Sequence, residues 1–134
     1  MLVISKLVGI GKYPAKGVGI NLIRRYYKMI NVLIVDDHPL TRLGIRSILN
    51  KSANVNSCFE AGSIKEMFQV LSSNICDFVL LDLVLPDTNG IVAIPPILDR
   101  YKSIKIIVIS AMAEERYAMQ ALKAGAHGFF SKES

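Results

Sequence analysis

The chain has 134 residues, 51% of them hydrophobic, which suits one globular domain of about 100–150 residues with a short addition. Its formal net charge of +5 is spread unevenly: residues 1–28 hold six basic residues and no acid, whereas the rest holds ten bases and eleven acids, a net of −1. The total charge alone would suggest a nucleic-acid-binding domain. The nearly neutral part from residue 29 onward argues against direct binding of nucleic acid there.

The sequence indicates neither a membrane span nor a signal peptide. No apolar stretch approaches the ~20 residues that a span needs, and lysine, glycine and proline interrupt the first residues. Cys58 and Cys76 have no CxxC or metal-ligand spacing, so we expect reduced thiols in a cytoplasmic protein. We expect residues 1–28 to be a basic extension, either a tag, the product of an upstream start or a partner-binding arm.

From Asn31 onward, short apolar runs alternate with helical patterns, which is typical of βαβ units around a parallel sheet. The predicted strands are residues 32–35, 55–60, 78–81, 104–109 and 127–130. Three of these runs are apolar without alternation, as expected for strands covered on both faces. The run at 55–60, "VNSCFE", is more polar and is predicted to be an edge strand.

Two helices are predicted between the first three strands. The first starts at Pro39, a residue favoured in a first helical turn, and its predicted apolar face is Leu40, Leu43 and Ile48. The second has Ser63 as its N-cap, and its apolar positions follow helical spacing: Ile64, Met67, Phe68 and Leu71.

The third helical pattern is irregular because Pro95 and Pro96 stand where a helix interior should be, so we expect a late start at Pro95 or a kink. The fourth pattern has acids in its first turn and Gly125 as its stop. Its predicted apolar face is Ala118, Ala121 and Leu122. No helix follows the fifth strand, so the predicted fold is a doubly wound α/β sheet that lacks its last helix.

Polar residues cluster at the carboxyl ends of the predicted strands, where ligands bind in doubly wound sheets. Asp36 and Asp37 follow the first strand, Asp82 the third, Ser110 the fourth and Lys132 the fifth. With strand order 2-1-3-4-5 these side chains converge. Neighbouring carboxylates need positive compensation, which Mg²⁺ together with the lysine would provide, and Mg²⁺ shared with phosphate oxygens suits phosphoryl chemistry.

The segments "LIVDDHPLTRLGI", "LLDLVLPDTNG", "VISA" and "AGAHGFFSK" together resemble the receiver domain of bacterial two-component response regulators. The first segment looks most like the subfamily with a helix-turn-helix output domain. The resemblance covers residues 29–134 and implies a flavodoxin-like sheet of five parallel strands in the order 2-1-3-4-5. It implies phosphorylation-dependent signalling that controls an output, transcription in that subfamily, through a domain not present in this chain.

The resemblance also implies roles for the residues at the strand ends. Asp82 would accept a phosphoryl group from a sensor histidine kinase, as a phosphoacceptor and not as an enzyme. Asp37 and Asp82 would ligate Mg²⁺ with the backbone carbonyl of Val84, and Asp36 would hold metal-bound water. The implied partners are the kinase and, on phosphorylation, a second copy of the chain. DNA would be contacted only through the output domain, and no membrane is implied.

In the same family, Lys132 and Ser110 would contact the phosphoryl oxygens. Phe129 would take the aromatic switch position that is coupled to the Ser110 hydroxyl. Val84 and Met112 are apolar at positions that flank the site, so attacking water would be poorly held and self-dephosphorylation slow.

Simpler interpretations remain for each residue. Asp36 could be a helix N-cap and Asp37 a first-turn acid. Lys132 could be an exposed lysine, Ser110 could cap the next segment, and Phe129 could be a core aromatic. His38 is expected to be a solvated or locally hydrogen-bonded imidazole with no chemical role. The rival functions are a degenerate receiver that acts as a scaffold without phosphorylation, and a phosphatase with an aspartate nucleophile. Such a phosphatase would need its second aspartate two residues after the first, a spacing absent here.

Overall fold

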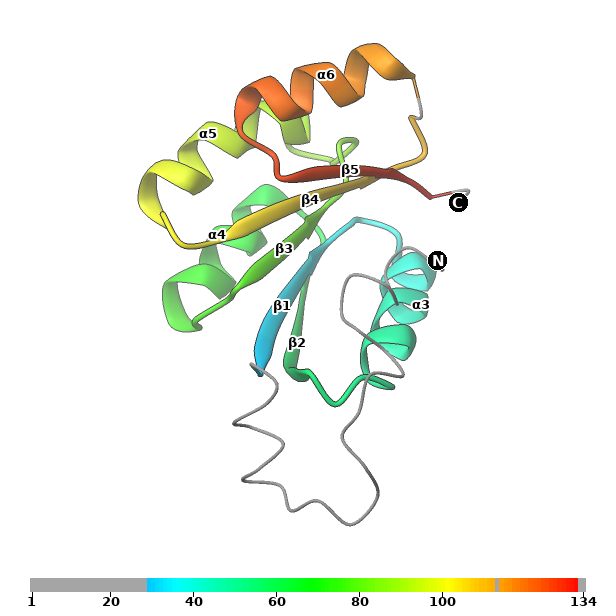
Figure 1. The fold of residues 1–134 in the computed structure, drawn as a ribbon, viewed down its shortest axis with the longest axis vertical. Helices are drawn as coiled ribbons and strands as arrows, with labels where there is room; N and C mark the ends of the chain where they lie inside the picture. Colours follow the sequence, from blue (N-terminus) through cyan, green and yellow to red (C-terminus); the bar gives the residue numbers. More distant parts are fainter. Residues whose placement is uncertain (1–28, 113, 133–134) are drawn as a thin grey trace.

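Five parallel strands form one sheet in the order β2-β1-β3-β4-β5 in the computed structural model, which describes residues 29–112 and 114–132 (Figure 1). The strands are β1 (Ile30–Val35), β2 (Val55–Ala61), β3 (Phe78–Leu81), β4 (Lys105–Ser110) and β5 (Gly128–Ser131). The predicted order and the predicted edge position of β2 are confirmed. The predicted extension 1–28 lies outside the described residues.

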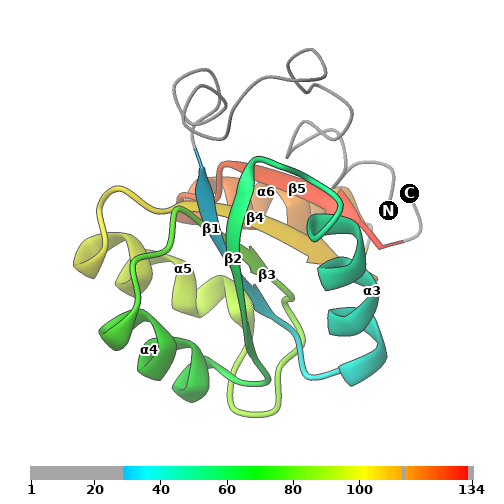
Figure 2. The same ribbon diagram turned by 90° about the horizontal axis from the view of Figure 1, so that it is seen from below.

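Four helices cover the sheet in the described part of the chain: α3 (Pro39–Leu49), α4 (Ile64–Ser73), α5 (Gly90–Arg100) and α6 (Glu115–Ala124). Helix α3 lies on one face, and α4, α5 and α6 lie on the other (Figure 2). Because side chains alternate along a strand, each strand feeds both layers. On β1, for example, Leu33 packs on the side of α4 and α5, whereas Val32 and Ile34 pack on the side of α3.

The predicted apolar face of helix α3 is correct at Ile48, which packs against the buried side chains of the sheet, but wrong at its other two residues. Leu40 and Leu43 are 82% and 61% exposed, whereas Ile45 and Leu49 are buried against the sheet. The apolar residues of this helix surround most of its circumference, so periodicity alone did not identify the face that packs on the sheet. The predicted start at Pro39 is confirmed.

Helix α3 is fastened to the edge strand β2 by two arginines. Glu60 accepts from Arg42 Nε at 3.1 Å and from Arg46 Nε at 2.8 Å. Arg46 also donates through Nη2 to the backbone carbonyl of Cys58 at 2.8 Å. These contacts fix the polar side of the helix over β2 and turn its opposite side toward solvent.

Helix α5 runs from Gly90 through both prolines, so the predicted late start at Pro95 is wrong. The Asn89 side chain accepts from the N–H of Ile91 at 2.8 Å and starts the helix. Pro95 and Pro96 lie on the exposed side, where carbonyls left without an intrahelical donor can bind water. Burial of Ala93, Ile94 and Ile97 on the other side offsets that loss.

Helices α4 and α6 follow their predicted ends. Ser63 caps α4 by accepting from the N–H of Glu66 at 3.1 Å, and Gly125 ends α6 with a φ of 115°, which favours glycine. The predicted face of α6 is correct at Ala121, which is buried, but wrong at Leu122, which is 46% exposed. None of the helices in the described ranges has the length and apolar content that crossing a bilayer would require.

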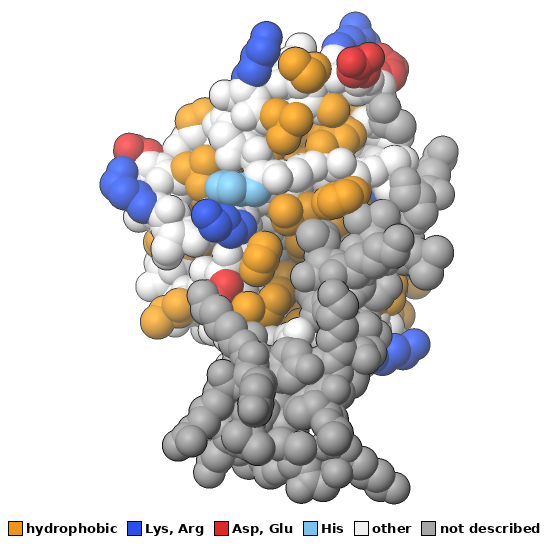
Figure 3. Space-filling model, in the orientation of Figure 1, with side chains coloured by type: hydrophobic (Ala, Val, Ile, Leu, Met, Phe, Trp, Pro, Cys, Tyr) orange, Lys and Arg blue, Asp and Glu red, His pale blue; other side chains and the backbone are white. Residues whose placement is uncertain are grey.

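Figure 3 shows apolar side chains grouped along the middle of one face, with charged side chains mainly toward its edges. Two separate clusters of buried side chains form the core. The larger cluster lies under α4, α5 and α6, and the smaller lies under α3. The strands between them are therefore packed on both faces, which positions the residues that follow their carboxyl ends.

Candidate functional site

The hydrogen bonds of the sheet continue past the strand ends into the predicted site. The N–H of Asp36 donates to Ala61 at 3.0 Å, that of Asp82 to Val35 at 2.9 Å, and that of Lys132 to Ser110 at 2.9 Å. Each of the three site residues is therefore positioned by backbone pairing with a neighbouring strand. The sheet brings them together as the sequence predicted.

Lys132 lies between two buried carboxylates. Its Nζ is 2.7 Å from Asp36 Oδ2 and 3.3 Å from Asp82 Oδ2, and its side chain is 17% exposed. Asp36 and Asp82 are both almost fully buried. The simpler interpretation of Lys132 as an exposed lysine is therefore wrong.

Burial and nearby charges shift the pKa values of Asp82 and Lys132. Burial, followed by the nearby Asp36 charge, raises the pKa of Asp82, although Lys132 and a backbone hydrogen bond from Val84 act against the rise. Burial alone would lower the pKa of Lys132, but hydrogen bonds and charge from Asp36 and Asp82 raise it above its usual value. The lysine is thus kept charged and neutralises part of the carboxylate charge.

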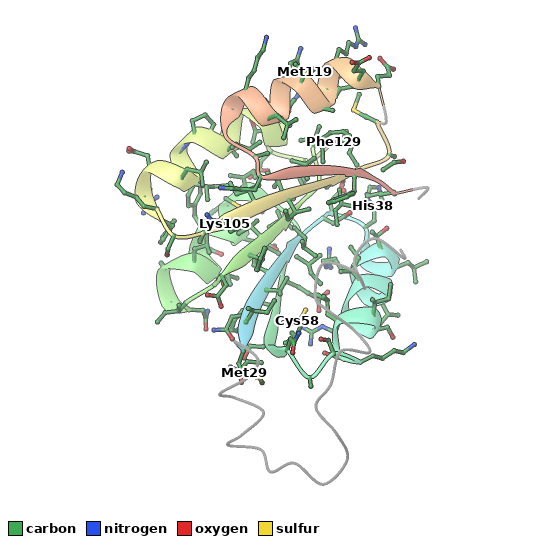
Figure 4. All side chains as sticks on the ribbon, viewed as in Figure 1. Met29, His38, Cys58, Lys105, Met119 and Phe129 are labelled. Atoms are coloured by element: carbon green, nitrogen blue, oxygen red, sulfur yellow. The ribbon has the colours of Figure 1, made fainter. Side chains whose placement is uncertain are left out.

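Asp37 and His38 form the solvent side of the site. Asp37 is partly exposed, and its Oδ1 lies 3.1 Å from His38 Nδ1. The same ring nitrogen is 2.7 Å from Asp36 Oδ1 and 4.0 Å from Asp82 Oδ2. Figure 4 shows His38 beside the end of β1 and the start of α3. The predicted local hydrogen bonding of this imidazole is confirmed, but its position among three carboxylates was not foreseen.

The remaining predicted site residues surround this cluster. Ser110 is fully buried, and its hydroxyl accepts from the N–H of Met112 at 3.0 Å. Phe129 on β5 is half-buried and packs against the core cluster under α6, and Figure 4 labels it beside β5. Val84, two residues after Asp82, is 56% exposed. Its isolated bridge with Asn89 closes the loop between β3 and α5.

Two residues that hold this loop were not predicted from the sequence. A side chain at Gly90 would meet the backbone oxygen of Asp82 at 2.5 Å, so this close approach requires glycine. Asp87 accepts from the N–H groups of Ile64 and Lys65 at 3.1 and 3.0 Å and so ties the loop to the start of α4. A glycine after "DTN" signals a turn in the sequence, but its contact with Asp82 is visible only in the fold.

A family model described as Response regulator receiver domain matches residues 32–134. The chain belongs to this receiver domain family. Its curated relatives include the response regulator UvrY of Escherichia coli, 36% identical over 78% of this chain and 48% of that protein. The Fimbriae Z protein of Salmonella typhimurium is 32% identical over 78% of this chain and 50% of that protein. The receiver domain thus spans about half the length of these relatives.

Solved structures of similar fold include RcsB of Salmonella enterica serovar Typhimurium, bound to the promoter rprA in the presence of the phosphomimetic BeF₃⁻. It is 27% identical, with a TM-score of 0.73 over 78% of this chain and 60% of that chain. A LuxR-family two-component response regulator from Aurantimonas is 28% identical, with a TM-score of 0.74 over 80% of this chain and 76% of that chain.

The donor atoms of the receiver domain's acidic cluster fit a divalent cation. Ligand atoms of Asp36, Asp37, His38 and Asp82 all lie within 4.8 Å of one another. Three carboxylates and one lysine leave a net charge of −2, which a dication would balance. Carboxylate and carbonyl oxygens are the donors that Mg²⁺ takes in proteins.

Proposed function

We propose that this receiver domain accepts a phosphoryl group on Asp82 from the phosphohistidine of a sensor kinase, with Mg²⁺ as the required ion. The observation that carries the proposal is the contact of Lys132 with both Asp36 and Asp82 at adjacent strand ends. Phosphoryl transfer depends chiefly on positioning and on stabilisation of charge, and this edge of the sheet offers both.

In the transfer, an oxygen of the Asp82 carboxylate forms a bond to phosphorus. The bond from phosphorus to the histidine nitrogen breaks, and its electron pair leaves with the imidazole. Asp37, Asp82 and the carbonyl of Val84 would hold Mg²⁺, which supplies compensating charge to the phosphoryl oxygens. Asp36 would orient water on the ion.

Lys132 and Ser110 would bind the phosphoryl oxygens of the product. Ser110 would have to give up its present role as acceptor for the Met112 N–H, or add a contact to it. That movement would be coupled to the Phe129 ring as the switch. The signal would control transcription through an output domain, in line with the promoter complex of the similar RcsB. Apolar Val84 and Met112 would make self-dephosphorylation slow.

The test is the intact mass of the protein after incubation with acetyl phosphate and Mg²⁺. We expect one phosphoryl adduct in the wild type and none in Asp82→Asn. Asp99→Asn is the matched control, because Asp99 is 85% exposed on α5 and its substitution makes the same chemical change away from the site. An adduct that persists in Asp82→Asn would overturn the assignment, and no adduct in the wild type would favour a degenerate scaffold.

Mg²⁺ should bind weakly, because one or two carboxylates with water form only a partial cage. Titration should show the largest loss of Mg²⁺ affinity in Asp37→Asn. Unchanged affinity in that variant would instead make Asp36 the direct ligand.

A further inference from the structure

A pocket of about 360 Å³ lies at the amino ends of β3 and β4, at the opposite end of the sheet from Asp82. Two connections form it, one from α4 to β3 and the other from α5 to β4, and both lie at that end of the sheet (Figure 1). The lining residues are Leu71, Asn74, Ile75, Cys76 and residues 100–104. The volume falls within the range of about 300–1,000 Å³ that is typical of small-molecule sites.

The inner wall of the pocket is apolar. Leu71, Cys76 and Ile104 are buried and belong to the larger core cluster, whereas Ile75 at the rim is 83% exposed. Burial, together with the nearby Asp77 charge, raises the pKa of the Cys76 thiol to about 11, so this sulfur is an apolar wall atom and not a nucleophile. A ligand with an apolar body would exchange water for apolar contacts along this wall.

Arg100 provides a positioned donor group beside this wall. Its guanidinium carbon lies 5.0 Å from the ring centre of Phe68 and 5.7 Å from that of Tyr101, so two aromatic rings hold the planar group. Among the residues that the structure describes, no oxygen accepts a hydrogen bond from this guanidinium. Its N–H groups are therefore available to a ligand, and their fork matches the two oxygens of a carboxylate.

The charge of the lining favours an anion. Arg100 and Lys102 are the charged residues that line the pocket, and both are basic. The C-terminal ends of α4 and α5 also lie there, and each contributes about half a negative charge, which leaves the lining net positive. Asp99 lies 4.0 Å from Lys102 Nζ, but it is 85% exposed and outside the lining, so water screens its charge.

We propose that this pocket binds a small organic carboxylate, whose charged group pairs with Arg100 and whose apolar body lies against Ile75 and Ile104. The inference goes beyond the proposed function, because the pocket takes part in neither metal binding nor phosphoryl transfer. A ligand bound here would join the connections that lead into β3 and β4, the strands that end at Asp82 and Ser110.

The test is titration of the purified full chain with naphthoate, followed by the backbone amide NMR signals. Naphthoate should shift the signals of residues 74–76 and 100–104 and reach saturation. The neutral amide, naphthamide, has nearly the same shape and should bind roughly tenfold more weakly, the scale of one lost hydrogen bond between charged groups. No phosphodonor or Mg²⁺ is present, so failure of Asp82 phosphorylation would not affect the result.

Three variants separate the charged contact from the apolar one. Arg100→Met keeps an apolar stem but removes the charge, so naphthoate affinity should fall roughly tenfold while naphthamide affinity stays almost unchanged. Arg116→Met is the matched control, because Arg116 also lies over an aromatic ring, 4.8 Å from the centre of Tyr117, but does not line the pocket. Ile75→Ser should weaken both compounds by a similar factor, because it removes apolar contact and no charge.

Equal affinities of the wild type for naphthoate and naphthamide would overturn the proposal, and so would wild-type naphthoate affinity in Arg100→Met. Signal shifts that grow without saturation, or that spread over surfaces far from the pocket, would also overturn it, because they would indicate nonspecific association of the aromatic rings.

Discussion

Gly90→Ala tests whether the first residue of α5 sets the position of the Asp82 backbone. The added Cβ would lie 2.5 Å from the backbone oxygen of Asp82 and 3.0 Å from the Cα of Leu83. Both are main-chain atoms, so no side-chain rotation relieves the overlap. Either the β3 end or the start of α5 must move, and the Gly90 N–H bond to Leu83, 2.7 Å long, opposes their separation.

Overpacking of this kind typically destabilises by about 1–3 kcal/mol. Alanine in a helix recovers at most about 0.5–1 kcal/mol relative to glycine. The net loss in the free energy of unfolding should therefore be about 1–2 kcal/mol. For a domain of this size that is a fall in Tm of roughly 4–12 °C.

Gly44→Ala is the matched control, because Gly44 lies inside α3 and an added Cβ there meets nothing within 4 Å. This variant should gain about 0.5–1 kcal/mol. Urea unfolding at pH 7 should move the midpoints of the two variants in opposite directions. Phosphoryl uptake from acetyl phosphate should slow in Gly90→Ala and remain normal in Gly44→Ala.

Wild-type stability and uptake in Gly90→Ala would refute the reasoning, since the close approach would then be relieved without consequence. Lower stability with normal uptake would show that α5 moves and that the Asp82 backbone does not.

Three further predictions concern charge. Asp82→Asn should unfold at higher urea than the wild type at pH 7 without Mg²⁺, because burial and the Asp36 charge raise the pKa of Asp82 and disfavour its charged form in the folded state. The difference should vanish below about pH 4, where this carboxyl is protonated in both states, and equal midpoints at pH 7 would contradict it. Lys132→Met should lose about 3 kcal/mol at pH 7, because it leaves buried carboxylates unpaired. The loss should be smaller in the Asp82→Asn background, and purely additive effects in a double-mutant cycle would count against this coupling. Because the pKa of Lys132 is raised, the stability that Lys132 contributes should be complete below about pH 10 and decline above it. Asp87→Ala should lose about 1 kcal/mol by urea unfolding, as for a lost helix cap, and Asp87→Asn should lose less. Burial slightly raises the pKa of Asp87, but the N–H groups of Ile64 and Lys65 lower it further than burial raises it. The stability that Asp87 contributes should therefore be present above about pH 4 and decline as the pH falls further. A loss independent of pH would contradict this account.

The sheet could be predicted well because its signals are local. Residues 78–81 form an uninterrupted apolar run, and the observed strand β3 has the same bounds. The site followed from the sheet, because parallel strands bring their carboxyl ends to one edge and Asp36, Asp82 and Lys132 each come directly after a strand. Strand order and residue type were sufficient there.

The predictions that were wrong or incomplete concern helix orientation, helix start and side-chain position, which depend on tertiary packing. Leu40 and Leu43 have suitable spacing for a buried face, but ion pairs of the neighbouring arginines with Glu60 turn them outward. Pro95 predicted a late start or a kink of α5, yet the helix begins at Gly90, because burial of Ile94 and Ile97 outweighs the lost backbone bonds. The position of His38 depends on distances between strand ends, which no pattern in the sequence contains.

The contacts of the two α3 arginines with β2 also protect this edge of the sheet against aggregation. An edge strand offers unpaired backbone groups to any other extended chain and is a common starting point for aggregation. At this edge Arg46 already occupies the Cys58 carbonyl, and Arg42 and Arg46 hold the charged Glu60 beside it. A second chain adding to β2 would have to displace α3 from these contacts. Helix α3, which begins at the site, thus also shields the β2 edge of the sheet from pairing with other copies of the chain.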